Sequence, residues 1–451
     1  MKIKDSKLYA VLILVSLLFG SCRKYVEIDT YGSRTLKTTN DYQYLINNRV
    51  NFQTTSIMPI ISNDDISGTP SQAAANQWGE QVLKAFLWSE SFYGDDQQDI
   101  GWNNLYKHVY VANEILQGVM ESADGSESQK QIIAAEARVH RAFAYFSLVN
   151  QYAQIYNPST AANQLGVPLL LRPDLFQELN RAPLQTVYQQ IVTDLEQSID
   201  VLPNRPAINH HPSKLAVYAL LTRVYMTMRD FEKAAENADR ALALNPELIN
   251  VADYVDATYP QVIDDPEVIL SKLSSGSVTG PINAELVALY DVKDLRLTHF
   301  LENNASLNGF KYMKPTKSGS FYAVVGLSTP EIYLNRAEVY ARQNNVAKTV
   351  ELLNALRMKR FRTVDYVALT AADIQSDLLQ AVIDERRREF VGTDLRWYDM
   401  RRLTLDGAYY KPVERTLNGQ TYRLDANSPR FVYPINQEVL TLNPEIGQNP
   451  R

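Results

Sequence analysis

The stretch from Lys214 to Pro246 constrains the fold of this 451-residue chain more tightly than any other part of the sequence. Apolar residues recur there at three- and four-residue spacing on both sides of Arg229-Asp230, which predicts two helices joined by a tight turn. Small residues, Ala234 and Ala241, stand where the two helices would cross. Antiparallel helices approach closely only where such small side chains meet, so we expect a packed helix pair.

The same stretch has the spacing of a tetratricopeptide repeat, a helix pair of about 34 residues. The matching residues stand at offsets 0, 9, 16 and 21 and are Tyr225, Ala234, Ala241 and Pro246. A second pair over 330–360 matches more loosely, because Thr349 and Leu356 replace the alanines. Apolar periodicity predicts two further pairs, 103–120 with 129–152 and 183–202 with 214–228. The pairs do not follow one another at a fixed period, so we expect a mainly α scaffold rather than a plain repeat array.

Two segments lack the periodic runs of this scaffold, which we place at about 103–246 and 330–402. In 41–100, short apolar patches and an aromatic cluster predict loops with one or two short helices. The second segment, 247–329, is rich in Pro, Gly, Ser and Tyr. Long insertions inside a compact domain are usually functional. We therefore expect 41–100 and 247–329 to meet on one loop-rich ligand face.

The aromatic residues of the first segment are candidates for a sugar-binding surface. Trp78, Trp88 and Tyr93 fall in a stretch rich in Gly, Ser and Asp, which favours an exposed loop. Aromatic rings stack on sugar C–H groups, and polar side chains bind hydroxyls. We predict Trp88 and Tyr93 as stacking platforms, helped by Trp78, with Asp64 and Asp96 as hydroxyl partners. Packing of the aromatic rings in the core is the alternative.

The first 22 residues have the pattern of a targeting segment. A basic start is followed by an apolar run from Leu8 to Phe19 and by small residues before Cys22. This order is typical of a secretory signal, and the run is too short for a membrane span of ~20 residues. The end of the segment, Leu-Phe-Gly-Ser-Cys, resembles a bacterial lipobox, in which the cysteine is acylated. We expect a signal peptide over 1–21, lipidation of Cys22 and a polar tether over 22–40; an ordinary signal peptide with an incidental cysteine is the alternative.

The sequence carries no catalytic or cofactor signature. It contains no phosphate-binding loop and no GxGxxG, GxSxG or HExxH motif. The single cysteine excludes a multi-cysteine metal site, and the five histidines lack ligand spacing. Asp95, Asp96 and Asp99 do not have the spacing of an EF-hand loop. We therefore expect no enzyme, metal or cofactor, although a carboxylate pair for glycosidic cleavage is set in space and is not visible in a sequence.

Six arginines close together would suggest nucleic-acid binding if they stood alone. They are Arg386, Arg387, Arg388, Arg396, Arg401 and Arg402. Acidic residues alternate with them, and the whole chain has a net charge of −6. Interleaved charges pair with one another rather than create a field for phosphates. The sequence therefore predicts an internal ion-pair network and no nucleic-acid partner.

Six motifs in chain order resemble the SusD/RagB family of outer-membrane lipoproteins of the Bacteroidetes. They are the lipobox at Cys22, the helix Ala135–Phe146, Gly166-Val-Pro168, Glu331–Glu338, Asp384–Phe390 with Arg396–Arg402, and Tyr433-Pro-Ile-Asn436 with Leu442-Asn-Pro444 and Gln448-Asn-Pro450. Each motif is modest alone, but their order along nearly the whole mature chain is specific. Trp88 and Tyr93 stand before the first long helix, a region that contributes stacking aromatics in similar proteins.

The resemblance implies one SusD-like domain over 41–451, with four tetratricopeptide-like helix pairs that carry an irregular ligand face. It also implies a non-enzymatic lipoprotein of the cell outer membrane, facing the exterior. Such a protein captures a nutrient, usually an oligosaccharide, and delivers it to a SusC-like TonB-dependent outer-membrane transporter. Two other functions stay open: a secreted lipoprotein glycoside hydrolase, and a tetratricopeptide-type scaffold that binds peptides.

Overall fold

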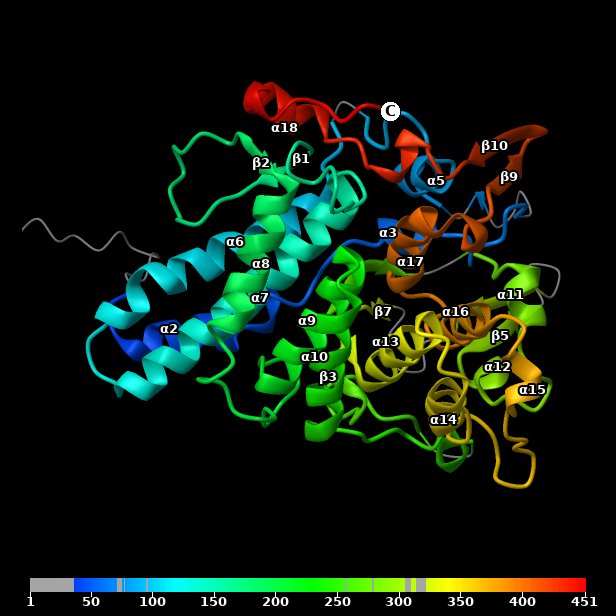
Figure 1. The fold of residues 1–451 in the computed structure, drawn as a ribbon. Helices are drawn as coiled ribbons and strands as arrows, with labels where there is room; N and C mark the ends of the chain where they lie inside the picture. Colours follow the sequence, from blue (N-terminus) through cyan, green and yellow to red (C-terminus); the bar gives the residue numbers. More distant parts are fainter. Residues whose placement is uncertain are drawn as a thin grey trace, which may run out of the picture.

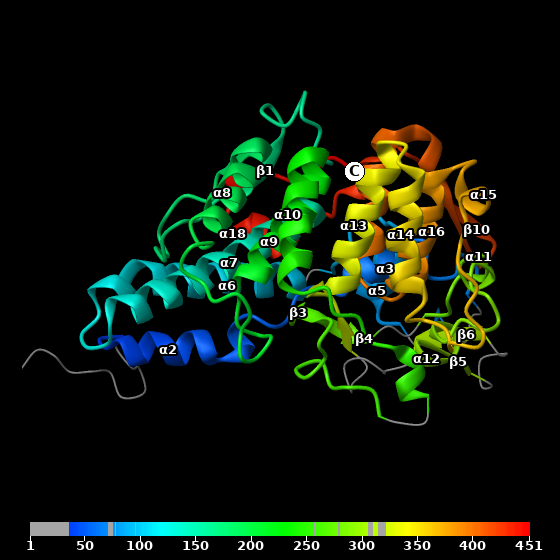
Figure 2. The same ribbon diagram turned by 60° about the horizontal axis from the view of Figure 1, so that its bottom comes forward.

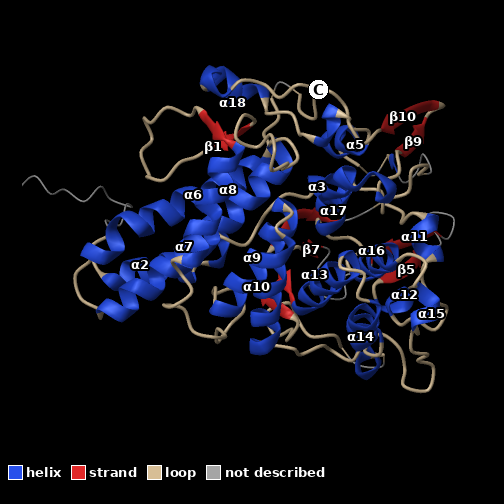
Figure 3. Cartoon of the chain, in the orientation of Figure 1, coloured by secondary structure: helices blue, strands red, loops and turns tan. Residues whose placement is uncertain are grey.

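The computed structural model describes residues 36–70, 75–76, 78–94, 96–255, 258–277, 280–304, 310–313 and 322–451. The expected signal peptide over 1–21, the lipidation site Cys22 and most of the tether over 22–40 lie outside these residues. Helices dominate the described residues, where strands form short antiparallel pairs (Figure 3). The predicted mainly α fold is confirmed.

The first predicted helix pair is present at one end of the molecule (Figure 1). Helices α6 (Ile100–Gly118) and α7 (Glu127–Tyr152) pack against each other, and α8 (Leu184–Glu196) and α2 (Thr39–Asn47) pack on α7. Each long helix begins at a capping side chain: Asp99 accepts a hydrogen bond from the Trp102 amide, and Ser126 accepts one from that of Gln129. Because α7 is covered from several sides, nearly all of its C-terminal half is buried.

The helix pair predicted over 214–246 is also confirmed. Helix α9 (Lys214–Met228) ends where Arg229 adopts a left-handed conformation with φ 64°, and Asp230 caps α10 (Phe231–Leu244). Ala234 and Ala241 are buried in this pair. Small side chains therefore lie at the packed face, as the spacing predicted.

The remaining scaffold helices continue from α10. Helix α13 (Thr329–Arg342) packs on α10, on α14 (Val346–Arg357) and on α16 (Leu378–Glu389). Figure 2 shows α13, α14 and α16 side by side. Helix α17 (Leu395–Leu403) follows α16 and packs on α3 (Met58–Ser62). The helix predicted over 183–202 ends at Glu196, after which the chain continues in turns.

The two loop-rich segments meet, as predicted. An antiparallel β-bridge joins Ile66 to Ile282, and a parallel β-bridge joins Thr54 to Leu273. The Asn283 amide also donates to the Asp65 carbonyl over 2.8 Å. Segment 41–100 holds more helix than expected, namely α2, η2 (Arg49–Asn51), α3 and α5 (Glu80–Phe86). The described elements of 247–329 are η4 (Val251–Tyr254), β3 (Val268–Leu270), β4 (Leu273–Ser277), α11 (Ala284–Ala288), α12 (Arg296–His299), β5 (Leu301–Asn304), β6 (Phe310–Met313), β7 (Tyr322–Val324) and β8 (Leu327–Ser328). Strands β3 and β4 pair with β8 and β7, and β5 pairs with β6.

Short elements complete the chain. They are η3 (Val119–Glu121), β1 (Leu165–Pro168), β2 (Arg181–Pro183), α15 (Ala371–Ile374), η6 (Thr404–Tyr409), β9 (Val413–Leu417), β10 (Gln420–Leu424), η7 (Pro429–Phe431), α18 (Gln437–Leu442) and η8 (Pro444–Ile446). Strands β9 and β10 form a hairpin whose turn, Asn418-Gly419, has positive φ at both residues. The C-terminal segment then returns to the first helix pair, where the Tyr433 amide donates to the Gln151 carbonyl over 2.7 Å.

Candidate functional site

The arginine cluster is an internal ion-pair network, as predicted. Arg386 binds Asp399 over 2.8 Å, and Arg402 binds both Asp399 and Glu338. Burial alone would raise the pKa of Asp399, but Arg386 and Arg402 outweigh that effect and hold the pKa at about 2. Arg401 departs from the prediction, since it donates to the carbonyl groups of Ala153 and Phe431 instead of a carboxylate.

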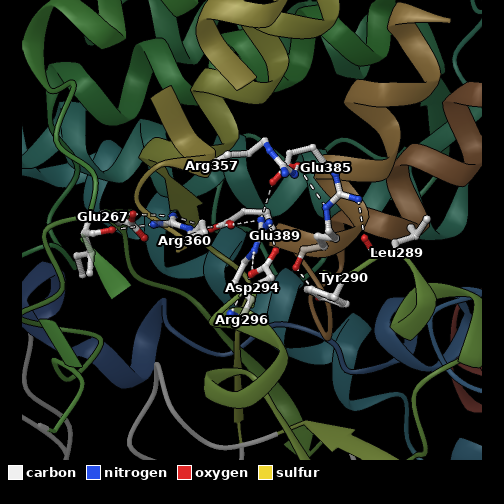
Figure 4. Close-up of polar contacts among 11 residues, drawn as sticks. Glu267, Leu289, Tyr290, Asp294, Arg296, Arg357, Arg360, Glu385 and Glu389 are labelled. Atoms are coloured by element: carbon white, nitrogen blue, oxygen red, sulfur yellow. Dashed lines mark hydrogen bonds and ion pairs between the residues drawn. The ribbon is translucent and has the colours of Figure 1, made fainter. Parts of the chain in front are cut away.

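Figure 4 shows a neighbouring network that anchors the 247–329 segment to α16. Arg360 lies between Glu267 and Glu389, each 2.8 Å away, and is fully buried. Arg296 binds Glu389 over 2.9 Å from the other side. Because these buried arginines and carboxylates compensate one another's charges, the network holds the 247–329 segment against α16.

The two acidic residues predicted at the site, Asp64 and Asp96, lie in different surroundings. Both carboxylate oxygens of Asp64 accept hydrogen bonds from Arg396, over 2.6 and 2.7 Å, and Arg387 lies 3.6 Å away. Burial alone would raise the pKa of Asp64. Arg387 and Arg396 lower the pKa by more than burial raises it, so the carboxyl group stays ionised. Asp64 is therefore ion-paired to α17 and lies near Arg387 of α16, and its role as a hydroxyl partner stays a prediction. Asp96 is exposed on a turn, and its role stays a prediction.

The expected exposure of the aromatic cluster is wrong. Trp88 is only 3% exposed, and its Nε1 donates to the Ser62 carbonyl; Trp78 and Tyr93 are 8% and 7% exposed. Two residues of this stretch are helix N-caps, Gly79 before α5 and Asp99 before α6, so they mark helix starts rather than an open loop. The aromatic rings therefore turn inward, and core packing, the alternative reading, is what the structure shows.

A pocket of about 420 Å³ lies instead between α6, the loop from 169 to 180, and α18. One wall is an aromatic stripe of α6, formed by Trp102, Tyr106 and Tyr110 at four-residue spacing. The rings of Trp102 and Tyr106 lie 4.7 Å apart, and the Tyr106 hydroxyl donates to the Pro168 carbonyl over 3.0 Å. Tyr110 is 39% exposed, so its ring is available to a bound molecule.

The rest of the pocket combines apolar and polar groups. Val439, Leu442 and Ile446 face the pocket from the C-terminal segment. The polar lining residues are Gln98, Asn103, Asn113, Arg172, Asp174, Gln177, Glu438 and Asn443. Asn113 is fixed, since it donates to the Leu170 carbonyl over 2.9 Å and accepts from Arg141 over 2.7 Å. A mainly apolar hollow with a few placed polar groups is typical of a small-molecule site.

The sequence did not lead us to predict this pocket, although the aromatic residues that form one of its walls could be identified there. Tyr106 and Tyr110 fall within the predicted helix over 103–120, and with Trp102 they repeat every four residues. That spacing places aromatic rings on one helix face. Nothing in the sequence shows that the 169–180 loop and α18, more than 250 residues apart, close over this face.

Within the described part of the chain, no His, Cys, Asp and Glu side chains gather in a group of three suited to a metal ion. None of the helices described there combines the length and the apolar character needed to cross a bilayer.

Sequence comparisons place two family models on the chain. A model described as starch-binding and associating with the outer membrane matches residues 33–226, and the SusD family model matches 316–451. SusD-like protein P2 of Formosa agariphila is 24% identical over 390 residues, 71% of this chain and 74% of that protein. A SusD-like protein of Bacteroides ovatus is 30% identical over 136 residues, 29% of this chain and 23% of that protein.

Solved structures share the fold. A putative sugar-binding protein from Bacteroides vulgatus superposes with a TM-score of 0.74 at 20% identity, covering 93% of this chain and 99% of that one. A SusD superfamily protein from Bacteroides thetaiotaomicron gives 0.71 at 22% identity, with 92% and 100% coverage. A laminarin-binding SusD-like protein gives 0.65 at 18% identity, with 92% and 99% coverage.

Proposed function

Because this chain belongs to the SusD/RagB family, we propose that it is an outer-membrane lipoprotein that binds an oligosaccharide and delivers it to a transporter. In this proposal residues 1–21 are removed, Cys22 carries the lipid, and 41–451 form one domain that faces the cell exterior. The protein binds its ligand without turning it over. The family match to an outer-membrane, starch-binding group supports the binding role.

The aromatic pocket on α6 is the observation that carries the ligand proposal. Tyr110 and Tyr106 offer ring edges and faces, while Asn103 and Gln177 offer amide groups at the rim. Rings that contact sugar C–H groups and amides that bind hydroxyls are the combination that carbohydrate recognition uses. We place the bound sugar against Tyr110, because that ring is open to solvent.

Binding to laminarin, starch and other glycans tests the proposal, with calorimetry on the purified mature protein. Affinity for the right glycan should be weak, on the order of micromolar to millimolar, because the pocket is open to water. Tyr110→Ala should weaken it at least tenfold. Tyr44→Ala removes another exposed tyrosine, on α2 and away from the pocket, and should leave binding unchanged. Equal affinities of Tyr110→Ala and the native protein would place the ligand elsewhere.

Delivery requires a partner, and we propose a SusC-like TonB-dependent barrel. No phosphate-binding motif is present in the sequence, so uptake needs energy and a pore from another protein. Gentle detergent extraction followed by pull-down should recover a stoichiometric barrel with this chain. Recovery of the lipoprotein alone would contradict the partner, and release of shorter glycans from a bound oligosaccharide would contradict the non-enzymatic role.

A further inference from the structure

A second, much smaller cavity lies where the N-terminal segment, α7 and the start of β4 meet. Its volume is about 10 Å³, the space of one water-sized particle. Its lining residues are Ile46, Arg49, Phe52, Gln53, His140, His210, Ser271 and Lys272. These come from four parts of the chain that are far apart in sequence, and no acidic side chain is among them.

Lys272 is the central charge of this cavity. It is fully buried, its Nζ donates to the Phe52 carbonyl, and it lies 3.0 Å from Nδ1 of His140. Among the residues that the structure describes, the polar partners of Lys272 are the Phe52 carbonyl and His140, and no carboxylate pairs with it. Its other close neighbours are the rings of Phe143 and Phe52, 5.2 and 6.0 Å away. A buried ammonium without a counter-charge is costly, and burial lowers the pKa of Lys272 to about 7.

Further donors in the cavity wall lack a protein partner. Within the described residues, Ser271 Oγ, Gln53 Nε2 and both ring nitrogens of His210 make no hydrogen bond. Ser271 is 4% exposed, so water outside the protein cannot serve it freely. Buried polar groups are almost always paired, so unpaired polar groups around one small cavity indicate that something else occupies it.

The charge and the volume of the cavity together indicate what it binds. Lys272 and Arg49 make the cavity positive, which disfavours a metal cation. The cavity is close in size to one water molecule, so a single-atom anion comes nearer to that size than a phosphate, sulfate or carboxylate group. We propose that the cavity binds one halide ion, chloride under natural conditions, held by the Lys272 ammonium and the Ser271 hydroxyl.

Such an ion would join the scaffold to the 247–329 segment. The Leu273 amide donates to the Gln53 carbonyl over 2.9 Å, and the Ser271 amide donates to the Asn209 carbonyl over 2.8 Å. His140 belongs to α7, the central scaffold helix. The bound ion therefore lies at the junction of all four parts, independently of which glycan the protein takes.

Bromide provides a direct test, because it replaces chloride and scatters X-rays anomalously. Crystals of the mature protein soaked in sodium bromide should show an anomalous peak in this cavity, within contact distance of Ser271 Oγ and Lys272 Nζ. An ordered water without anomalous signal, at bromide concentrations that label surface sites, would overturn the proposal.

Thermal unfolding gives a second readout in solution. Replacing sodium gluconate by sodium chloride at equal ionic strength should raise the melting temperature of the native protein by a few degrees. Ser271→Ala and Arg49→Gln should reduce that rise, and Lys272→Met should abolish it. Lys233→Gln removes an exposed cation of α10 and serves as the matched control, with the rise retained. A rise of equal size in all five proteins would contradict a specific site.

Discussion

The indole Nε1 of Trp88 donates a hydrogen bond of 2.9 Å to the carbonyl oxygen of Ser62, which joins the turn after α5 to the end of α3 inside the core. The Arg415 guanidinium lies 4.2 Å from the Trp88 ring centroid and donates to the carbonyl groups of Phe86 and Asn63. Segments near residues 62, 88 and 415 therefore form one buried unit. The aromatic segment is a structural junction beneath the surface of the molecule.

Removal of this junction should destabilise the protein. Trp88→Ala leaves a large cavity and removes the shorter of two hydrogen bonds to the Ser62 carbonyl, so we expect a loss of about 3–5 kcal/mol in the free energy of unfolding. Urea denaturation followed by circular dichroism measures it. Tyr44→Ala, on an exposed ring, is the control and should cost less than about 0.5 kcal/mol. A Trp88→Ala protein as stable as the control would mean that Trp88 is not a core residue.

Overpacking tests the helix pair that the sequence predicted. Ala241→Leu forces a larger side chain into the buried face of α10, so we expect a loss of about 1–3 kcal/mol in the free energy of unfolding. Ala243 lies two residues further along α10 and is exposed, so Ala243→Leu should change stability by less than about 0.5 kcal/mol. Melting temperatures of both variants that match the native protein would contradict the packing at Ala241.

The buried ion pairs should tolerate the loss of one partner poorly. Glu338→Gln leaves Arg402 buried without full compensation, so we expect a loss of about 3–5 kcal/mol. Glu351→Gln breaks an exposed pair with Lys348 and should cost less than about 0.5 kcal/mol. Chemical denaturation of the two variants measures the difference, and similar small losses in both would show that the buried network contributes little.

Lys272 should make stability depend on pH. Burial lowers its pKa from the ordinary 10.5 to about 7, so between these values the unfolded chain binds a proton that the folded chain does not. The free energy of unfolding should therefore rise with pH from about 7 to 10.5, and stay level below 7, relative to Lys272→Met. The difference between the two proteins should grow by several kcal/mol across that range. Unfolding in sodium gluconate buffers, which exclude halide, measures it, and parallel pH profiles would contradict the lowered pKa.

Attachment to the membrane should depend on Cys22. Labelled palmitate should enter the native protein, and Cys22→Ala should abolish both the label and sedimentation with membranes. Ser21→Ala keeps the cysteine and a small residue before it, so it should retain both. Labelling of Cys22→Ala at the native level would contradict the lipobox, and protease treatment of whole cells would show whether the domain faces the exterior.

The sequence by itself determined the scaffold. Periodic apolar residues and capping side chains act within one or two helical turns. The helix pair α9–α10 and the long helix α7 can therefore be predicted from the sequence. The interleaved arginines also predicted their own pairing, because residues such as Arg402 and Asp399 are neighbours on one helix face.

Only the tertiary structure decided which residues are free to bind. Trp88 and Tyr110 are both aromatic residues near the start of the scaffold, yet Trp88 is covered by Arg415, more than 300 residues away, and Tyr110 is left open beside α18. Lys272 likewise meets His140 and Phe52 only after folding, so no local pattern marks its cavity. The spacing of residues along the chain determines helices because helical hydrogen bonds join residues four apart. The exposure of a side chain depends on which distant segment packs over it, and that is a property of the whole fold.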